Sequence, residues 1–356
     1  MRVGIYTPYL DSFGGGERYV LTACEVLSKE HQVDLLLNEH LISLQPAELI
    51  NRLGGHLNLD LSKINLVQAP MDGNPLSKYL FTRKYDCLIY VTDGSIFLSG
   101  AKKGFIHFQV PFKNTVARDL WGRVKLSTWD LGICNSIFTE KIISREWPIR
   151  TEVLYPPVVV EEIKPLKKEQ YILSVGRFNS FTRAKKHEEM IKAFIELYQA
   201  AKIKDWSLHL AGSVEGDKKY LDELKTLAGK APVFFYPDLS FAKLMELYGK
   251  SSIYWHAAGF GETDPAKMEH FGITTVEAMA GGCVPVVVNL GGQTVIVEDG
   301  ISGFLWDNIS GLTKQTLRLI SNKELLDKMA QAAVARSAKF SKKNFVRRIN
   351  KLVYEK

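Results

Sequence analysis

The feature that most constrains the fold is a regular alternation of short, β-branched apolar segments with longer helical patterns. This alternation is typical of parallel sheets that carry helices on both faces. The predicted strands lie at 3–7, 33–37, 64–68, 87–91, 105–108, 131–135 and 152–154, and then at 171–175, 208–211, 233–235, 253–255, 284–288 and 303–305. The sequence therefore predicts an α/β protein built from doubly wound parallel sheets.

The alternation is interrupted once, near residue 160. Pro156 and Pro157 stop regular structure there, and the next strand begins only at Tyr171. At 356 residues the chain is also longer than one hydrophobic core usually grows. We therefore expect two Rossmann-like domains, 1–160 and 161–341, and a final helix at about 342–356 that could pack back on the first. A ligand is expected in the cleft between them, at the carboxyl ends of the strands.

Cysteine usage and hydropathy indicate the compartment. The four cysteines lie far apart and form no CxxC pair, which argues against a disulfide framework or a zinc site. The chain opens directly on a predicted strand, so we expect no signal peptide. No apolar run approaches the roughly 20 residues of a membrane-spanning helix. We expect a cytoplasmic protein.

Positive charge is concentrated at the C-terminal end. The net charge is +7, and residues 314–356 contain twelve Lys and Arg but only three Asp and Glu. A solvated helical face is one explanation. The other is a peripheral contact with anionic lipid at the inner face of a membrane. Nucleic acid is disfavoured, because aromatic residues are not interleaved with the basic ones.

The strongest functional signal is a pair of carboxylates, Glu269 and Glu277, separated by seven residues. Glu269 is expected in a loop. Glu277 is expected in the first turn of an apolar helix whose start is marked by Thr274 and Thr275. A helix N-terminus offers N–H groups and a partial positive charge that suit a diphosphate. Flanking carboxylates can accept hydrogen bonds from sugar hydroxyls, so this segment predicts a sugar-nucleotide site.

Basic residues are expected beside this site. Arg177 follows the strand 171–175, and Lys185 and Lys186 precede the next helix. The planar fork of an arginine and the point charge of a lysine would together neutralise a diphosphate that gains charge as it departs. Plain surface charge is the alternative. For Lys186 surface charge is the favoured reading, and the choice between Lys185 and Lys186 as the phosphate ligand stays open.

Three further features allow two readings each. The glycines at 14–16 open a helix and let the backbone approach a ligand, or they form a plain turn. His107 lies at the end of a strand and is either a core residue or a contact to the sugar or the acceptor. His256 lies at the end of another strand, near the glutamate pair, and its role is equally open.

The Gly-x-Gly-x-x-Gly fingerprint of NAD- and FAD-binding proteins is absent, which excludes a dehydrogenase.

Taken together, these segments resemble the retaining glycosyltransferases of the GT4 family, which have the GT-B fold. The matching pieces occur in the family's order over most of the chain. They are the Gly14–Arg18 loop, Val175-Gly176-Arg177 with Lys185, the run from Glu269 through the helix to Val287, Gly291-Gly292, and Glu298 to Gly303.

The resemblance implies a hexosyltransferase that needs neither a metal ion nor another cofactor. It implies that Glu277 holds the ribose of the nucleotide and that Glu269 binds hydroxyls of the donor sugar. Arg177 and Lys185 would hold the diphosphate, and His107 would contact the sugar or the acceptor. Further substrate contacts are implied for Gly15, Gly16, Phe271, Gly272, Ile273, Thr274 and Thr275.

The run 269–273 resembles mannosyltransferases that build lipid-linked oligosaccharides, which favours GDP-mannose as donor. UDP-glucose and UDP-N-acetylglucosamine stay open. The expected acceptor is a hydroxyl of a glycan or a lipid-linked sugar, as in polysaccharide biosynthesis. A sugar-nucleotide-binding subunit without catalytic activity, on the same fold, is the alternative.

Overall fold

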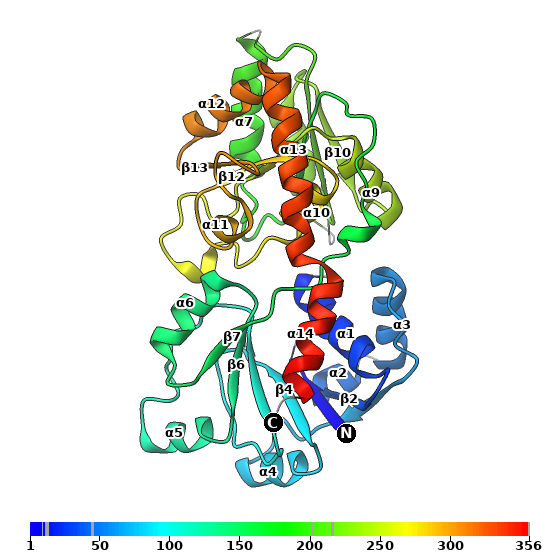
Figure 1. Ribbon diagram of the computed structural model, residues 1–356, viewed down its shortest axis with the longest axis vertical. Helices are drawn as coiled ribbons and strands as arrows, with labels where there is room; N and C mark the ends of the chain where they lie inside the picture. The colour runs from blue at the N-terminus through cyan, green and yellow to red at the C-terminus, as the bar shows by residue number, and fades with distance from the viewer. Residues whose placement is uncertain (9, 11–13, 44–45, 201, 215–216, 355–356) are drawn as a thin grey trace. The chain divides into compact units, whose positions relative to one another are not determined.

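A computed structural model describes residues 1–8, 10, 14–43, 46–200, 202–214 and 217–354. The chain divides into two compact units, Met1–Pro157 with Lys342–Lys356, and Val158–Ser341 (Figure 1). Residues 9 and 11–13, which belong to the predicted glycine-rich loop, lie outside the described part. Each unit contains a parallel sheet with helices on both faces, so the predicted fold class is confirmed.

The first unit has a seven-stranded parallel sheet in the order β3-β2-β1-β4-β5-β6-β7. Its strands are β1 Arg2–Tyr6, β2 Gln32–Leu37, β3 Ile64–Gln68, β4 Cys87–Val91, β5 Gly104–Phe108, β6 Leu131–Cys134 and β7 Thr151–Val153. Its helices are α1 Gly15–Leu27, α2 Glu39–Ser43, α3 Pro46–Leu57, α4 Pro75–Thr82, α5 Leu120–Leu126, α6 Ile137–Glu146 and α14 Lys342–Tyr354. One face packs against α1 and α14, and the other against α4, α5 and α6.

The second unit has a six-stranded parallel sheet in the order β10-β9-β8-β11-β12-β13. Its strands are β8 Tyr171–Val175, β9 Ser207–Gly212, β10 Val233–Pro237, β11 Ile253–His256, β12 Val284–Val288 and β13 Phe304–Trp306. Its helices are α7 His187–Gln199, α8 Lys218–Ala228, α9 Phe241–Lys250, α10 Ile273–Ala280, α11 Gln293–Ile296, α12 Ile309–Ile320 and α13 Lys323–Ser337. Short 3₁₀ turns lie at η1 Val160–Glu162, η2 Pro265–Lys267 and η3 Ala338–Phe340.

The strand positions follow from burial on both faces. All five residues of β4 and all five of β12 are buried, and strands of this kind read as continuous apolar runs rather than as alternating ones. Each of the thirteen predicted strands is present, with its ends displaced by at most two residues. The parallel arrangement also brings the carboxyl ends of β8, β11 and β12 to one edge of the second sheet.

The basic C-terminal segment is divided between the two units. Helices α12 and α13 belong to the second unit and α14 to the first. Part of its charge is already paired, because Lys342 lies 2.7 Å from Glu25 and the Arg336 guanidinium lies 2.6 Å from Glu298. No helix in the described part of the chain is both long and apolar enough to cross a bilayer. Membrane contact through this segment stays a prediction.

Candidate functional site

Two oppositely charged side chains of the second unit meet at the carboxyl edge of its sheet. The Lys185 Nζ donates to Glu269 Oε2 over 2.7 Å. Both side chains are only partly exposed, at 30% and 23%. Lys185 precedes α7, and Glu269 lies in the loop between η2 and α10 as predicted. The structure therefore joins two residues that the sequence analysis had assigned to one site.

The stem of Lys185 crosses the chain directly after β8. A Cβ added at Gly176 would lie 2.7 Å from Lys185 Cγ, so the absence of a side chain at Gly176 makes room for the lysine. Arg177 follows at the same strand end, is exposed and makes contacts of its own. The structure thus places the two predicted phosphate ligands at one end of β8.

Lys186 occupies a different position. It precedes the first residue of α7 in the left-handed conformation, with φ of 56°, and its ammonium lies 3.2 Å from Glu262. The carboxylate it meets belongs to the segment before η2, not to the glutamate pair. Of the two lysines that the sequence left open, the geometry favours Lys185.

The charge of Glu269 is stabilised by its neighbours. Burial alone would raise the pKa of its carboxyl, but Lys185 and His256 together hold that pKa well below its usual range. His256, the last residue of β11, has its Nε2 3.3 Å from Glu269 Oε2. Burial lowers the pKa of His256, and a hydrogen bond to the carboxylate requires that Nε2 carry a proton, because a carboxylate oxygen only accepts.

The start of α10 differs from the prediction. The helix begins at Ile273 behind Gly272, whose φ of 113° is a left-handed conformation that favours glycine. Glu277 is therefore the fifth helical residue and lies in the second turn, so its predicted place in the first turn is wrong. The N–H of Thr275 donates to the Gly272 carbonyl over 3.1 Å, which leaves Ile273 and Thr274 as the first-turn residues to face an anion.

Two side chains of this segment are interior residues. Phe271 is 3% exposed and packs edge-on against Phe340, with ring centroids 5.5 Å apart. Thr275 is completely buried. In contrast, the hydroxyl of Thr274 accepts a hydrogen bond of 2.8 Å from the hydroxyl of Tyr254 in β11. This bond fixes the start of α10 to the sheet.

Glu277 is buried, at 3% exposure, and one of its contacts is internal. Its Oε2 accepts a hydrogen bond of 3.0 Å from the hydroxyl of Tyr248, a fully buried residue of α9. A buried carboxylate needs such partners to offset its loss of water. The bond orients the carboxylate, and the sequence analysis did not find Tyr248 because α9 carries no recognisable motif.

The glycine turn at 291–292 lies against the glutamate loop. The Gly292 N–H donates to the Glu269 carbonyl over 2.7 Å, and a Cβ at Gly291 would lie 2.3 Å from the same oxygen. The next residue, Gln293, is completely buried, and neither amide atom has a hydrogen-bond partner within the described residues. Its Nε2 would lie 2.5 Å from a Cβ at Gly272. Sequence reasoning missed Gln293, although its position after two glycines was the available signal.

Predicted site residues of the first unit lie at the start of α1 and in β5. Gly15 and Gly16 form the first turn of α1, which begins behind Gly14. A Cβ at Gly16 would lie 2.6 Å from Gln109 Oε1, so a side chain at this position would require the end of Gln109 to move. Gln109 follows β5 directly and is a second polar residue at this edge that the sequence analysis did not name.

His107 lies inside the first unit. It is completely buried, its ring stacks on that of Tyr19 with centroids 4.0 Å apart, and burial lowers its pKa to about 3. An uncharged, enclosed imidazole favours the core reading that the sequence had left open.

Comparisons with known proteins place the second unit in a family. A family model described as glycosyl transferases group 1 matches residues 160–336, which make up nearly all of the second unit and include each of its candidate site residues. The chain belongs to the group 1 glycosyl transferases. Lys185, Glu269 and Glu277 lie within the matched segment.

Curated relatives of this chain include mannosyltransferases. The GDP-Man:Man(3)GlcNAc(2)-PP-Dol alpha-1,2-mannosyltransferase of Xenopus laevis is 30% identical over 203 residues, covering 51% of this chain and 39% of that protein. The alpha-1,3/1,6-mannosyltransferase alg-2 of Neurospora crassa is 27% identical over 288 residues, covering 69% of this chain and 59% of that protein. The matches therefore cover about two fifths to three fifths of the relatives' own lengths.

Solved structures support the GT-B fold. A glycosyltransferase from Rickettsia africae matches with a TM-score of 0.74 at 16% identity, over 99% of this chain and 97% of that one. Anabaena HepE in complex with UDP matches with a TM-score of 0.73 at 17% identity, over 99% of both chains. At such identities the likeness shows the fold alone.

Proposed function

We propose that this glycosyltransferase moves a hexose from a nucleoside-diphosphate sugar to a hydroxyl of a glycan or of a lipid-linked sugar. The observation that carries the proposal is the meeting of Lys185 with Glu269 beside the start of α10. An ammonium, a carboxylate and free helix N–H groups at one strand edge match the phosphate and the hydroxyls of such a donor.

Each residue then has one role. Arg177, Lys185 and the first-turn N–H groups of α10 bind the diphosphate. Glu277 accepts hydrogen bonds from the ribose, with Tyr248 orienting it, and Glu269 accepts them from the donor sugar. When the donor enters, the ammonium of Lys185 exchanges part of its contact with Glu269 for a phosphate oxygen, and the carboxylate becomes available to the sugar.

The proposed reaction keeps the configuration of the anomeric carbon. The acceptor oxygen forms a bond to that carbon on the side from which the phosphate departs. The bond between the carbon and the diphosphate oxygen breaks, and the departing oxygen takes the proton of the acceptor. The positive side chains stabilise the charge that develops on the phosphate, so no metal ion is required. Glu269 orients the donor and moves no proton.

GDP-mannose is the proposed donor. Two curated relatives carry mannosyltransferase names, one of which states GDP-Man as donor and a PP-Dol-linked acceptor. A structural neighbour was solved with UDP, which keeps UDP-hexoses as the competing donors. Thermal shift with GDP, UDP, ADP and their sugars decides between them, because a ligand at 100 times its Kd stabilises by about 2.7 kcal/mol.

A sugar-nucleotide-binding subunit without catalytic activity is the competing function. Both proteins would bind the nucleotide, so binding does not separate them. A transferase slowly hydrolyses its donor when no acceptor is present, and a binding subunit does not. Release of free mannose from GDP-mannose, abolished by Lys185→Met, would support the transferase. Tight donor binding without release of sugar or transfer would contradict it.

A further inference from the structure

Exposed apolar residues of the described chain gather on two short helices of the first unit. Eleven large apolar side chains are exposed among the described residues, and five of them belong to α4 and α5. These five are Leu76, Leu80, Leu120, Trp121 and Val124, and we call them the α4/α5 face. The two helices contain only eight and seven residues. A patch of this density indicates an interaction surface rather than scattered surface residues.

The apolar face of α5 is not the result of loose packing. Gly122 and Leu126 are buried on its inner side, and a Cβ at Gly122 would lie 1.7 Å from the Val116 carbonyl oxygen. The helix therefore lies so close to that loop that only glycine fits. Asp119 also caps it, accepting from the Gly122 N–H over 2.6 Å. These contacts fix the orientation of α5, so the side chains on its opposite side point outward.

Helical geometry separates apolar from basic residues on α5. At about 100° per residue, Leu120, Trp121 and Val124 share an arc opposite the buried side. Arg123 and Lys125 fall on the two flanks of that arc. The ammonium of Lys125 lies 5.8 Å from the centroid of the Trp121 ring, a distance at which a cation is attracted to an indole.

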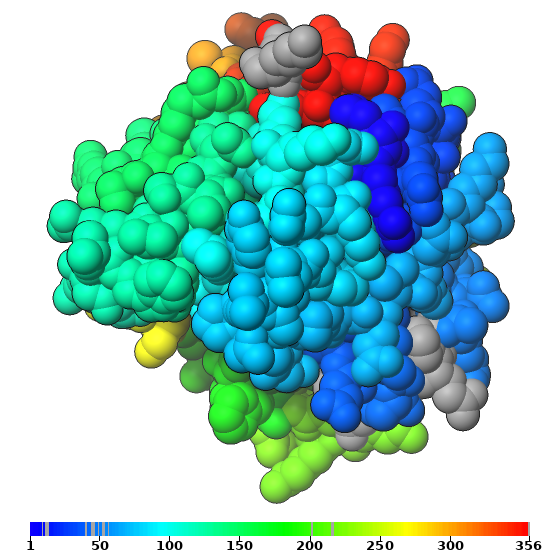
Figure 2. Space-filling view, turned by 90° about the horizontal axis from the view of Figure 1, so that it is seen from below, coloured from blue at the N-terminus to red at the C-terminus, as the bar shows by residue number. Residues whose placement is uncertain are grey.

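The two helices are linked through one loop on the same side of the sheet. Both lie in the layer that covers the same side of the sheet, and the loop at 99–100 joins them. The Gly100 N–H donates to the Thr82 hydroxyl of α4 over 2.8 Å, and the Ser99 N–H donates to Thr128, just beyond α5, over 3.0 Å. Figure 2 views the molecule from the side on which this part of the chain, coloured light blue to green, reaches the surface.

Charge is distributed unevenly along the sequence of the first unit. Residues 75–150 contain twelve Lys and Arg and six Asp and Glu, whereas residues 1–74 contain five and nine. The segment that carries the α4/α5 face is thus basic, and the part of the unit before it is acidic. The partner of this face is therefore expected to be anionic as well as apolar.

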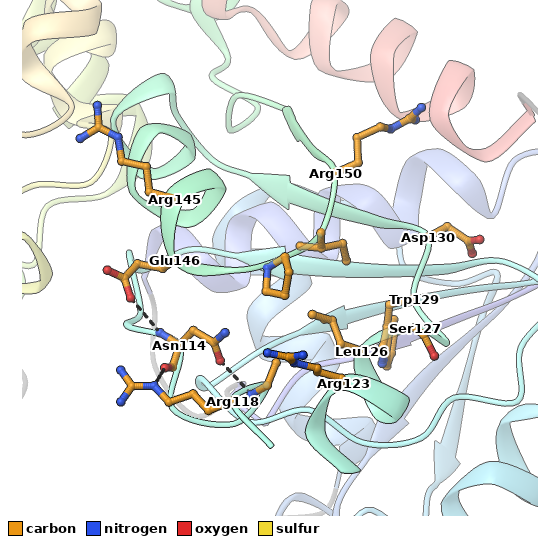
Figure 3. Close-up of a pocket in the computed structure, with 13 residues that line it drawn as sticks. Asn114, Arg118, Arg123, Leu126, Ser127, Trp129, Asp130, Arg145, Glu146 and Arg150 are labelled. Atoms are coloured by element: carbon orange, nitrogen blue, oxygen red, sulfur yellow. Dashed lines mark hydrogen bonds between the residues drawn. The ribbon is translucent and has the colours of Figure 1, made fainter. Parts of the chain in front are cut away.

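A hollow of about 760 Å³ beside α5 shows how this charge is arranged. Four arginines line it: Arg118, Arg123, Arg145 and Arg150. Their guanidinium groups do not converge, since Arg145 and Arg150 extend toward opposite sides (Figure 3). One bound anion would require convergent donors. Dispersed arginines suit a surface that presents many separate anionic groups.

We propose that the α4/α5 face docks the first unit on a lipid bilayer that carries anionic head groups. The five apolar side chains enter the interfacial layer, where tryptophan is favoured, and the surrounding basic residues contact lipid phosphates. This surface goes beyond the transfer reaction. It is also distinct from the membrane contact that the sequence predicted for residues 314–356.

Flotation of the full chain with phosphatidylcholine vesicles, with and without phosphatidylglycerol, tests the proposal at low salt. We expect wild type to float only with the anionic vesicles. The triple variant Leu120→Ser, Trp121→Ser, Val124→Ser is expected to stay at the bottom of the gradient. Arg123→Gln and Lys125→Gln should each lower partitioning about fivefold.

Matched controls separate this face from other exposed residues. Phe181→Ser with Ile301→Ser removes exposed apolar side chains of the second unit, and Lys314→Gln with Lys328→Gln removes basic ones from the C-terminal segment. Both controls are expected to float like wild type. If the basic control is lost from the vesicles and the α5 variants are retained, the C-terminal segment is the membrane contact and the proposal is wrong.

Tryptophan fluorescence gives a second, local readout. Trp121 is 50% exposed, and the other five tryptophans are at most 8% exposed. Brominated lipid should therefore quench Trp121 selectively and have no effect on the Trp121→Ser variant. The proposal is wrong if brominated lipid does not quench Trp121 or if wild type does not float with anionic vesicles. It is also wrong if the protein forms a dimer in solution that the α5 triple variant dissociates. Hydrolysis of the donor without vesicles should be the same in the triple variant and wild type. If wild type itself hydrolyses no donor, the proposed transferase function fails, whatever the result of vesicle binding.

Discussion

Lys185 and Glu269 are 84 residues apart in sequence, and their charged groups lie 2.7 Å apart. Lys185 precedes α7 and Glu269 lies in the loop before α10, so different parts of the fold hold the two side chains in place. The two candidate ligands for phosphate and sugar thus neutralise one another. Binding of the donor has to replace this contact with interactions that are at least as favourable.

Lys185→Met should weaken nucleotide binding, because it removes the proposed phosphate ligand. A hydrogen bond to a charged group is worth about 1.5–3 kcal/mol, so the Kd for GDP is expected to rise about 10- to 150-fold by calorimetry. Lys186→Met is the matched control, since that lysine contacts Glu262 instead. A larger loss of affinity in the control would assign the phosphate to Lys186.

Glu277→Ala should lower the affinity for the nucleotide by a similar factor, because it removes the proposed ribose ligand. The variant also leaves the buried Tyr248 hydroxyl unpaired, which by itself costs stability. Tyr248→Phe separates the two effects. It removes the hydroxyl and keeps the carboxylate, so it is expected to retain most of the affinity in calorimetry. Equal affinities of Glu277→Ala and wild type would refute the ribose role.

The fold was predictable from sequence because buried parallel strands leave a local mark. The run 284–288 is apolar throughout and is buried throughout. The order of the strands leaves no such mark. That β8 lies between β9 and β11 depends on how the connecting helices pack, which no periodicity records.

The candidate site was predictable only in part. Arg177, Lys185 and Glu269 lie next to predicted strands or helices. Each is a charged residue near glycines or apolar segments, so the local sequence indicates it. Tyr248 and Gln293 are interior residues whose partners come from other elements, so the sequence gives no local signal of their contacts. The error at Glu277 came from placing the start of α10 at Thr274 and Thr275, whereas the helix begins at Ile273, directly after Gly272 with its positive φ.

Gly272→Ala should destabilise the second unit and weaken donor binding. The new Cβ would lie 2.5 Å from the Gln293 amide, in addition to the cost of a positive φ, which is about 1–2 kcal/mol. Gly261→Ala is the matched control, because its φ is also positive, at 78°, and nothing lies within 4 Å of its Cβ. Denaturant unfolding should show the larger loss at Gly272.

The added variant Gln293→Ala tests the cause of that difference. If the clash is responsible, Gly272→Ala combined with Gln293→Ala should recover part of the lost stability, and the two changes should not be additive. Additive losses would mean that backbone strain alone explains the cost at Gly272.

EDTA is expected to leave transfer intact. In the proposed reaction Arg177, Lys185 and the start of α10 carry the positive charge that stabilises the departing diphosphate. Initial rates should therefore be equal in enzyme treated with EDTA and in untreated enzyme. A loss of activity that Mg²⁺ or Mn²⁺ restores would show that an ion shares this role, and the metal-free mechanism would have to be abandoned.

His107 should make the first unit less stable in acid. Its pKa is about 3 in the folded protein, against about 6.5 when unfolded, so the unfolded chain binds the extra proton. Stability is therefore lost as the pH falls from about 6.5 toward 3, by about 2 kcal/mol already at pH 5. Hydrogen exchange of β5 amides at pH 7 and pH 5 measures this loss, and His107→Phe should abolish most of it.

The same variant decides between the two readings of His107. Its ring stacks on Tyr19 inside the unit, and a phenylalanine can keep that contact. If His107 is a core residue, His107→Phe retains transfer at neutral pH within a few fold of wild type while it loses the acid sensitivity. If transfer disappears and the variant stays folded, the imidazole contacts the reacting sugar or the acceptor, and the unit must open to expose it.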